Sequence, residues 1–156
     1  MVAELLVDPR TLDPSKPLFG RDEIRRRNEQ RFEMEMLDGI LLNDHERGIV
    51  AGFLDVRRDA WWARGHFPDR PMLPGVLGLE AGGQLCSFAF KERHPDVRMG
   101  LGGIDHVRFR RPIEPPTILI VVAKVVAVRA RFGKFEFQGI VDGQLAFEAR
   151  FTGAAV

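Results

Sequence analysis

The chain has 156 residues, of which 45% are hydrophobic, so it is long enough for one domain with a sizeable core but too short for two. It carries 23 basic and 22 acidic residues, and the net charge of +1 gives no global field that would favour nucleic acid or an anionic membrane. A single cysteine excludes an intrachain disulfide and a multi-cysteine zinc site, which is typical of a reducing compartment, and we expect a cytoplasmic protein.

The first twenty residues predict an extended arm that lies over the surface of the domain. They contain Pro9, Pro14 and Pro17 and show little hydrophobic periodicity. Acidic residues interrupt the segment before any long apolar run develops, so we expect neither a signal peptide nor a membrane span. We therefore expect an arm over residues 1–20 and a single domain over residues 21–156.

The segments before the middle of the chain predict one helix and two strands. Residues 22–30 are rich in helix formers and polar on nearly all sides, which predicts a short exposed helix. Strands are predicted over residues 32–42 and 49–56, with a turn-forming segment between them. Residues 57–74 form a long connection, and connections of that length in a compact domain are usually functional.

A long buried helix is predicted from Gly75 to about Arg93. Pro74 precedes its start, Pro95 follows its end, and basic residues fall in its last turn, where the helix dipole favours them. Apolar side chains cover most of its circumference, which indicates a buried helix rather than an amphipathic one. A core position is expected for its one cysteine, Cys86.

Only strands are predicted after this helix, over residues 101–110, 117–130, 134–141 and 144–152. The dipeptide Asp142-Gly143 between the last two is the signal for a two-residue type I′ hairpin. One buried helix with about six antiparallel strands is an α+β fold in which the sheet must curl around the helix. Such a sheet has unpaired edges, and a two-fold dimer that continues the sheet is one way to cover them.

A lone carboxylate marks the predicted helix, because Glu80 is the single charged residue between Pro71 and Phe90. A buried carboxylate is costly unless it is paired or kept for chemistry. In apolar surroundings a carboxyl group can hold a proton near neutral pH and deliver it to a leaving hydroxyl. His66 precedes it in the long connection, and a neutral imidazole is well suited to take a proton from a carbon next to a carbonyl.

The start of the helix offers a third reactive group. Its first backbone N–H groups have no acceptor within the helix and can polarise a carbonyl oxygen as it becomes enolate-like. Gly75 stands at this start, and without a Cβ it lets a substrate approach the backbone closely. Base, acid and oxyanion donor together suit the β-elimination of water or its reverse. From the residues alone, an ordinary hydrogen-bonding role for His66 and a structural role for Glu80 remain as alternatives.

The block from Gly65 to Gln84, GHFPDRPMLPGVLGLEAGGQ, resembles the signature of the 3-hydroxyacyl-[acyl-carrier-protein] dehydratases of fatty-acid synthesis, a hotdog-fold family. The family pattern is approximately GHFPxxPxxPGVLxxEAxxQ. The stretch GIDHVRFRRP at residues 103–112 resembles the family's first strand after the helix, and the Asp-Gly hairpin its last turn. The resemblance spans about residues 32–153. It implies a hotdog fold, in which a curled antiparallel sheet wraps around one long central helix.

The resemblance also implies an activity, the dehydration of 3-hydroxyacyl thioesters to trans-2-enoyl thioesters. It implies that His66 is the base, Glu80 the partner carboxylate and Gly75 the donor to the thioester carbonyl. The other motif residues implied to bind substrate are Phe67, Pro74, Val76 and Gln84. In that family the histidine and the carboxylate meet across a dimer interface, so a homodimer is implied, with a trimer of dimers left open.

The substrate would arrive on the phosphopantetheine arm of acyl-carrier protein or on coenzyme A, and neither a further cofactor nor a metal ion is implied. A basic patch could dock an acidic carrier protein, with a solvated strand face as the alternative; its residues are Arg108, Arg110 and Arg111. We expect no nucleic-acid partner and no membrane span.

Two features depart from the family pattern or divide the family. Gly82 and Gly83 in mid-helix should together cost about 1–2 kcal/mol of helix stability, and we favour close packing of the helix on the sheet over room for an unusual acyl chain. Glu80 rather than Asp favours dehydration alone over the sister group that also isomerises. A hotdog acyl thioesterase and a non-catalytic acyl-binding subunit are the alternative functions, and the presence of both His66 and Glu80 disfavours the second.

Overall fold

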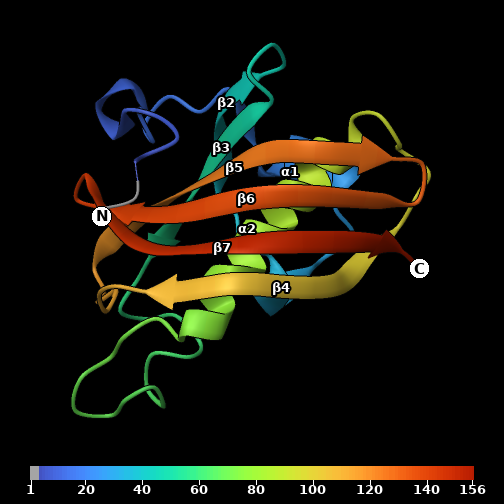
Figure 1. Cartoon of the computed structure of the whole chain (residues 1–156). Coiled ribbons are helices and arrows are strands. Elements are labelled where there is room, and N and C mark those ends of the chain that lie inside the picture. The colour runs from blue at the N-terminus through green and yellow to red at the C-terminus, as the bar shows by residue number, and fades with distance from the viewer. Residues whose placement is uncertain (1–3) are drawn as a thin grey trace.

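A computed structural model describes residues 4–156 and places one long helix inside a curled, seven-stranded antiparallel sheet (Figure 1). The helices are α1 (Arg21–Arg27) and α2 (Gly75–Lys91). The strands are β1 (Phe19–Gly20), β2 (Gly39–Asp44), β3 (Ile49–Val56), β4 (Met99–Phe109), β5 (Thr117–Arg129), β6 (Phe132–Val141) and β7 (Gln144–Ala155). The predicted α+β arrangement is therefore confirmed, with a strand count of seven rather than about six.

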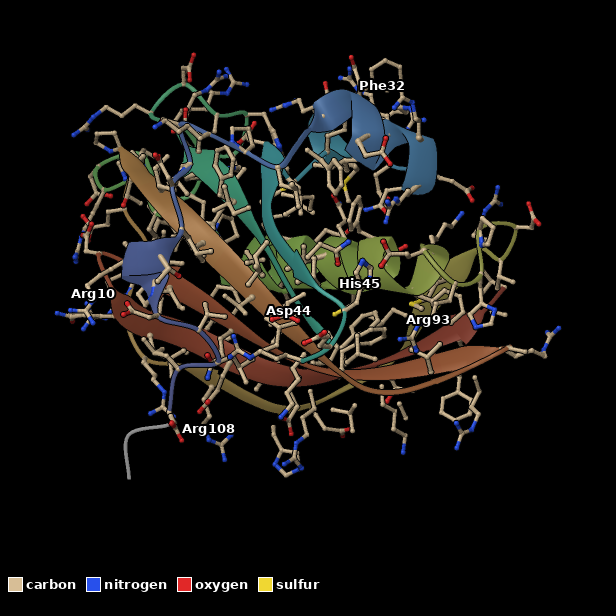
Figure 2. The ribbon with its side chains drawn as sticks, turned by 90° about the horizontal axis from the view of Figure 1, so that it is seen from above. Arg10, Phe32, Asp44, His45, Arg93 and Arg108 are labelled. Carbon is tan, nitrogen blue, oxygen red and sulfur yellow. The ribbon has the colours of Figure 1, made fainter. Side chains whose placement is uncertain are left out.

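The sheet has the order β1-β2-β3-β5-β6-β7-β4, so the strand that follows α2 in the sequence lies at the far edge. Consecutive strands β5, β6 and β7 pair through short turns, and the turn at Asp142 and Gly143 has φ values of 50° and 72°. Two successive positive φ values are the mark of a type I′ turn, which confirms the hairpin predicted from the sequence. In Figure 2, α2 lies in the hollow between the two flanks of the curled sheet.

The segment before β2 differs from the prediction. Residues 32–34 form a short 3-10 helix, and the strand begins only at Gly39, so the predicted strand over 32–42 is wrong in its first half. Phe32 has a φ of 59°, in the left-handed region that interrupts extended backbone. The helix α1 ends at Arg27 rather than near Gln30, because Asn28 is extended and its side chain donates to the backbone carbonyl of a residue on α2.

Glycines on one face of α2 explain how closely the helix approaches the sheet. Gly75, Gly78 and Gly82 share that face, as their spacing of three and four residues requires. A Cβ on Gly78 would lie 3.0 Å from the ring of Phe147, and a Cβ on Gly82 would overlap the ring of Phe137. Both rings are 1% exposed. Close helix–sheet packing is therefore confirmed as the reason for Gly82.

Replacement of Gly82 by alanine is expected to lower the free energy of unfolding by about 1–3 kcal/mol, because the added methyl group overpacks a fully buried ring. Alanine also favours the helical conformation over glycine by about 1 kcal/mol. A measured loss of stability would therefore report a steric conflict with the ring. Gly83→Ala is the matched control. It brings the same gain in helix propensity, but its Cβ would lie 3.3 Å from the ring of Phe151 and would not overlap it. Urea unfolding of both variants tests this, and equal changes in stability would contradict it.

The arm packs on the outer face of the sheet. Successive residues of β5 divide between two apolar clusters, with Val121 in the main core around α2 and Val122 in a second cluster that includes Val7 of the arm. The buried side chain of Gln138 on β6 accepts a hydrogen bond from the Leu6 N–H and donates one to the Glu4 carbonyl, each at 2.9 Å. None of the helices formed by residues 4–156 is long and apolar enough to cross a membrane.

Candidate active site

His66 lies in the loop between β3 and α2, and its own hydrogen bonds hold this loop closed. The Met72 N–H donates to the backbone carbonyl of His66 at 2.8 Å, and Nδ1 of the imidazole lies 2.8 Å from the carbonyl oxygen of Met72. A carbonyl oxygen only accepts hydrogen bonds, so Nδ1 carries the proton and donates it. When the ring is neutral the lone pair is then on Nε2, which is the tautomer that a general base requires.

A cavity of about 370 Å³ opens beside His66. It is bounded by the loop and the first turn of α2, and its walls include Trp61, Trp62, Arg64, Pro74, Val76 and Leu77. Phe67 stacks on the imidazole with 4.1 Å between the ring centroids. Trp61 and Val76 are 55% and 70% exposed, so the apolar wall is open on one side. Figure 1 shows this loop extending beyond the start of α2.

The start of α2 presents unpaired backbone donors next to this cavity. The N–H groups of Leu77 and Gly78 bind the carbonyl of Pro74 at 2.9 and 3.3 Å, whereas the N–H groups before them in the first turn have no acceptor inside the helix. Gly75 stands between Pro74 and Val76, which both line the cavity. A carbonyl oxygen placed here would meet the partial positive charge of the helix N-terminus.

Glu80 is half-buried on α2, and Gln84 fixes its position. Oε1 of Glu80 accepts a hydrogen bond of 2.8 Å from Nε2 of Gln84, one turn further along the helix. Nε2 of Gln84 also donates to the Met34 carbonyl at 2.6 Å, and its Oε1 accepts from the Met36 N–H at 3.0 Å. Both amide hydrogens and the amide oxygen are thus engaged within the chain. The side chain that the resemblance assigned to substrate binding holds the carboxylate, and its contact with substrate stays a prediction.

His66 and Glu80 are not brought together within one chain. Their side chains bind Met72 and Gln84 respectively, and Glu80 does not line the cavity beside His66. Of the residues singled out from the sequence, His66, Pro74 and Val76 line the cavity. Phe67 stacks on the His66 ring, and Gly75 lies in the chain between Pro74 and Val76.

The arginines considered for carrier docking lie elsewhere. Arg108 lies on the outer side of the sheet, away from α2 (Figure 2). Arg108 and Arg110 line a cavity of about 490 Å³ whose walls also carry glutamates, and Arg110 forms an ion pair with Glu148. The positive charge there is largely balanced. Arg111 is exposed just beyond the end of β4. Docking of a carrier protein on these side chains stays a prediction.

Other reactive groups do not add to the site. Cys86 is fully buried, and burial raises the pKa of its thiol, so the thiolate needed of a nucleophile does not form near neutral pH. In the described part of the chain, residues 4–156, no three His, Cys, Asp or Glu side chains gather as metal ligands. That neither a metal nor a cofactor is needed stays a prediction.

Comparison of the sequence with known proteins gives a family match and several relatives. Residues 28–150 match the family model of the FabA-like domain. The chain is 37% identical over 127 residues to the 3-hydroxyacyl-[acyl-carrier-protein] dehydratase FabZ of Albidiferax ferrireducens, covering 78% of this chain and 84% of that protein. It is 39% identical over 125 residues to the protein of the same name from Polynucleobacter asymbioticus, covering 78% and 83%.

Solved structures agree on the fold. The dehydratase heterocomplex ApeI:P from Xenorhabdus doucetiae superposes with a TM-score of 0.73 at 20% identity, covering 85% of this chain and 90% of that chain. The TT0310 protein from Thermus thermophilus gives a TM-score of 0.60 at 17% identity, covering 81% and 100%. At these identities the likeness establishes the fold alone, and it confirms the predicted hotdog fold.

Proposed function

This chain belongs to the FabA-like family, and from that premise we propose that it dehydrates 3-hydroxyacyl thioesters, carried by acyl-carrier protein, to trans-2-enoyl thioesters in fatty-acid or related acyl-chain biosynthesis. Relatives named 3-hydroxyacyl-[acyl-carrier-protein] dehydratase align with more than three quarters of the chain. The observation that carries the proposal is the placement of the His66 imidazole, whose Nδ1 binds Met72 and whose Nε2 does not, at an apolar cavity beside the free N–H groups of a buried helix.

In the proposed reaction, Nε2 of His66 takes the proton from C2 of the substrate. Negative charge then develops on the thioester oxygen, where the Gly75 N–H can stabilise it. The hydroxyl on C3 leaves with a proton from Glu80, so the C2–H and C3–O bonds break, a C2–C3 double bond forms, and water is released. The proton on His66 returns to Glu80 through solvent. The same steps in reverse hydrate an enoyl thioester.

We further propose that Glu80 of one protomer serves His66 of its partner in a homodimer. The absence of any hydrogen bond between the two residues within one chain supports this. β4 ends the sheet with β7 as its one neighbour among the described residues, and it exposes Leu101 and Phe109 at 63% and 53%. Pairing of two such edges would continue the sheet and cover both. A trimer of dimers is left open, and the cytoplasmic location stays a prediction.

Absorbance measurements on crotonyl and 3-hydroxybutyryl thioesters of pantetheine test the reaction. The purified protein should interconvert the two, seen as a change in enoyl absorbance, without releasing free thiol. Thiol release without interconversion would instead support a thioesterase. The absence of both signals would support a non-catalytic acyl-binding subunit.

Gln84→Leu is expected to lower kcat by roughly ten- to a hundredfold with little change in KM, because Glu80 loses the N–H that orients it. Circular dichroism on the same preparation should show a folded protein, so that the loss is assigned to the position of the carboxyl group.

Gly82→Ala is the control for that experiment, because it also destabilises α2 but leaves the bond between Gln84 and Glu80 in place. An equal loss of kcat in both variants would mean that Gln84 acts through stability alone.

A further inference from the structure

The N-terminal arm lies against the sheet but is not one of its strands. Over residues 4–17 its backbone–backbone hydrogen bonds all close turns within the arm, such as the bond of 3.1 Å from the Thr11 N–H to the Asp8 carbonyl. The first such bond to another part of the chain runs from the Leu18 N–H to the Ile40 carbonyl, beside β1. The arm can therefore leave the sheet without breaking a pair of strands.

Side chains of the domain hold the arm in place instead. The amide of Gln138 is 6% exposed and binds the Leu6 N–H and the Glu4 carbonyl, so its acceptor and one of its donors both engage the arm. Arg47 donates to the Leu6 carbonyl at 3.2 Å. The backbone of residues 4–6 is thus bound as an extended peptide ligand would be.

The face beneath the arm is apolar, although it is the outer face of the sheet. In Figure 2 the arm, marked by Arg10, lies on the side of the sheet away from α2. The outer face of such an antiparallel sheet is commonly solvated and polar. Here Val7 of the arm packs in one cluster with side chains of β3, β5 and β6 that are at most 5% exposed, namely Ile49, Ala51, Val122 and Ile140. Release of the arm would expose them as one apolar patch.

This patch is separate from the other surfaces of the protein discussed so far. It lies on β3, β5 and β6, whereas the edge proposed for dimerisation is β4, and β7 stands between β6 and β4 in the sheet. The arm also precedes residues 28–150, the part of the chain that matches the family model. The arm is therefore an addition to the family domain that covers a face not needed for the proposed dimer.

We propose that the arm is a cover that limits assembly, because it keeps the apolar outer face of β3, β5 and β6 from binding the same face of a second copy of the protein. Two sheet faces lined by β-branched side chains can pack on one another as the sheets of a β-sandwich do, and Ile49, Val122 and Ile140 supply such side chains. A two-fold contact then buries the same patch on both copies. The inference goes beyond the proposed function and does not depend on it, since assembly is measured without substrate.

Val7→Asp in the full-length chain tests this assignment, because the arm cannot stay on the patch with an unpaired carboxylate at a buried position. Size-exclusion chromatography with light scattering should show a species of about twice the wild-type mass or more, at concentrations where wild type keeps its own mass. Thr11→Asp is the matched control, since it adds the same charge to the arm at an exposed position. It should keep the wild-type mass.

A second substitution separates association through this face from aggregation of a misfolded chain. In Val7→Asp/Val122→Lys the uncovered patch carries a charge at its centre, so the wild-type mass should return. The inference is overturned if Val7→Asp keeps the wild-type mass, if Thr11→Asp associates as strongly, or if the double variant stays associated.

Gln138→Ala decides the question if circular dichroism shows that Val7→Asp does not fold. It removes both hydrogen bonds of the amide to the arm without introducing a charge. Its mass should rise above that of wild type as the protein concentration is raised. A mass that follows wild type at every concentration would overturn the inference.

Discussion

His66→Ala is expected to lower the rate of dehydration by roughly 10²–10⁴-fold, the usual cost of removing a general base. The imidazole donates from Nδ1 to the Met72 carbonyl and keeps Nε2 free for substrate, so its loss removes the group that accepts the C2 proton. The fold should persist, because His66 is a loop residue that is only partly buried and belongs to neither apolar cluster. Steady-state kinetics and circular dichroism on the same preparation measure both effects.

His45→Ala provides the control for this loss. His45 is exposed on the turn between β2 and β3 and contacts Glu92 at 3.3 Å, away from the loop that carries His66. It should retain wild-type turnover. Near-normal turnover of His66→Ala would remove His66 from the mechanism and leave the reaction without a base.

Glu80→Gln should be similarly inactive, with a loss of roughly 10²–10⁴-fold, and equally well folded. The amide keeps the shape of the carboxylate but cannot deliver a proton to the leaving hydroxyl. The substitution also separates two roles for this residue, since a purely structural partner of Gln84 would tolerate an amide. Retention of most of the activity would therefore favour the non-catalytic alternative for Glu80.

Mixing the two inactive proteins tests whether the pair acts between protomers. A heterodimer of His66→Ala and Glu80→Gln chains would contain one site with both native residues and one site with neither. With random subunit exchange half of the dimers are mixed, so recovered activity should approach about a quarter of wild type if the sites are independent. Exchange is verified separately with differently tagged chains. No recovery despite proven exchange would place both residues in one chain.

Local sequence patterns were sufficient to predict the elements whose bounds are set by residues within them or next to them. β3 has the predicted bounds, because its apolar run is bordered by turn residues on one side and a charged loop on the other. α2 begins at the predicted Gly75, since Pro74 ends the preceding loop and most of the circumference of the helix is apolar. The Asp142-Gly143 turn follows from the tolerance of both residues for positive φ.

Long-range contacts decided the elements that were predicted wrongly. The amide of Gln84 binds backbone groups of Met34 and Met36, which a strand neighbour would otherwise pair with, so this segment does not extend β2. Asn28 leaves the helical conformation and donates to the backbone of α2. Both contacts join parts of the chain that lie far apart in the sequence, and no local window contains them.

The motif spacing identified the reactive groups of the candidate site but not their supports. His66, Gly75 and Glu80 stand out because of their chemistry, whereas Phe147 looks like any other inward-facing strand residue. Gly82 and Gly83 in mid-helix indicated close packing of the helix on the sheet. Which rings would pack against the helix depended on the strand order, and that order came only with the structure.

The position of β4 in the sheet has a consequence for how the protein is made. β4 is translated before β5 and β6, yet its one strand neighbour among residues 4–156 is β7, the last strand in chain order. Until β7 has been made, β4 therefore lacks its strand neighbour and has two open edges. The edge proposed for dimerisation acquires its shape only once β7 has emerged. Pairing of subunits is thus expected between finished chains rather than between neighbouring chains still in synthesis.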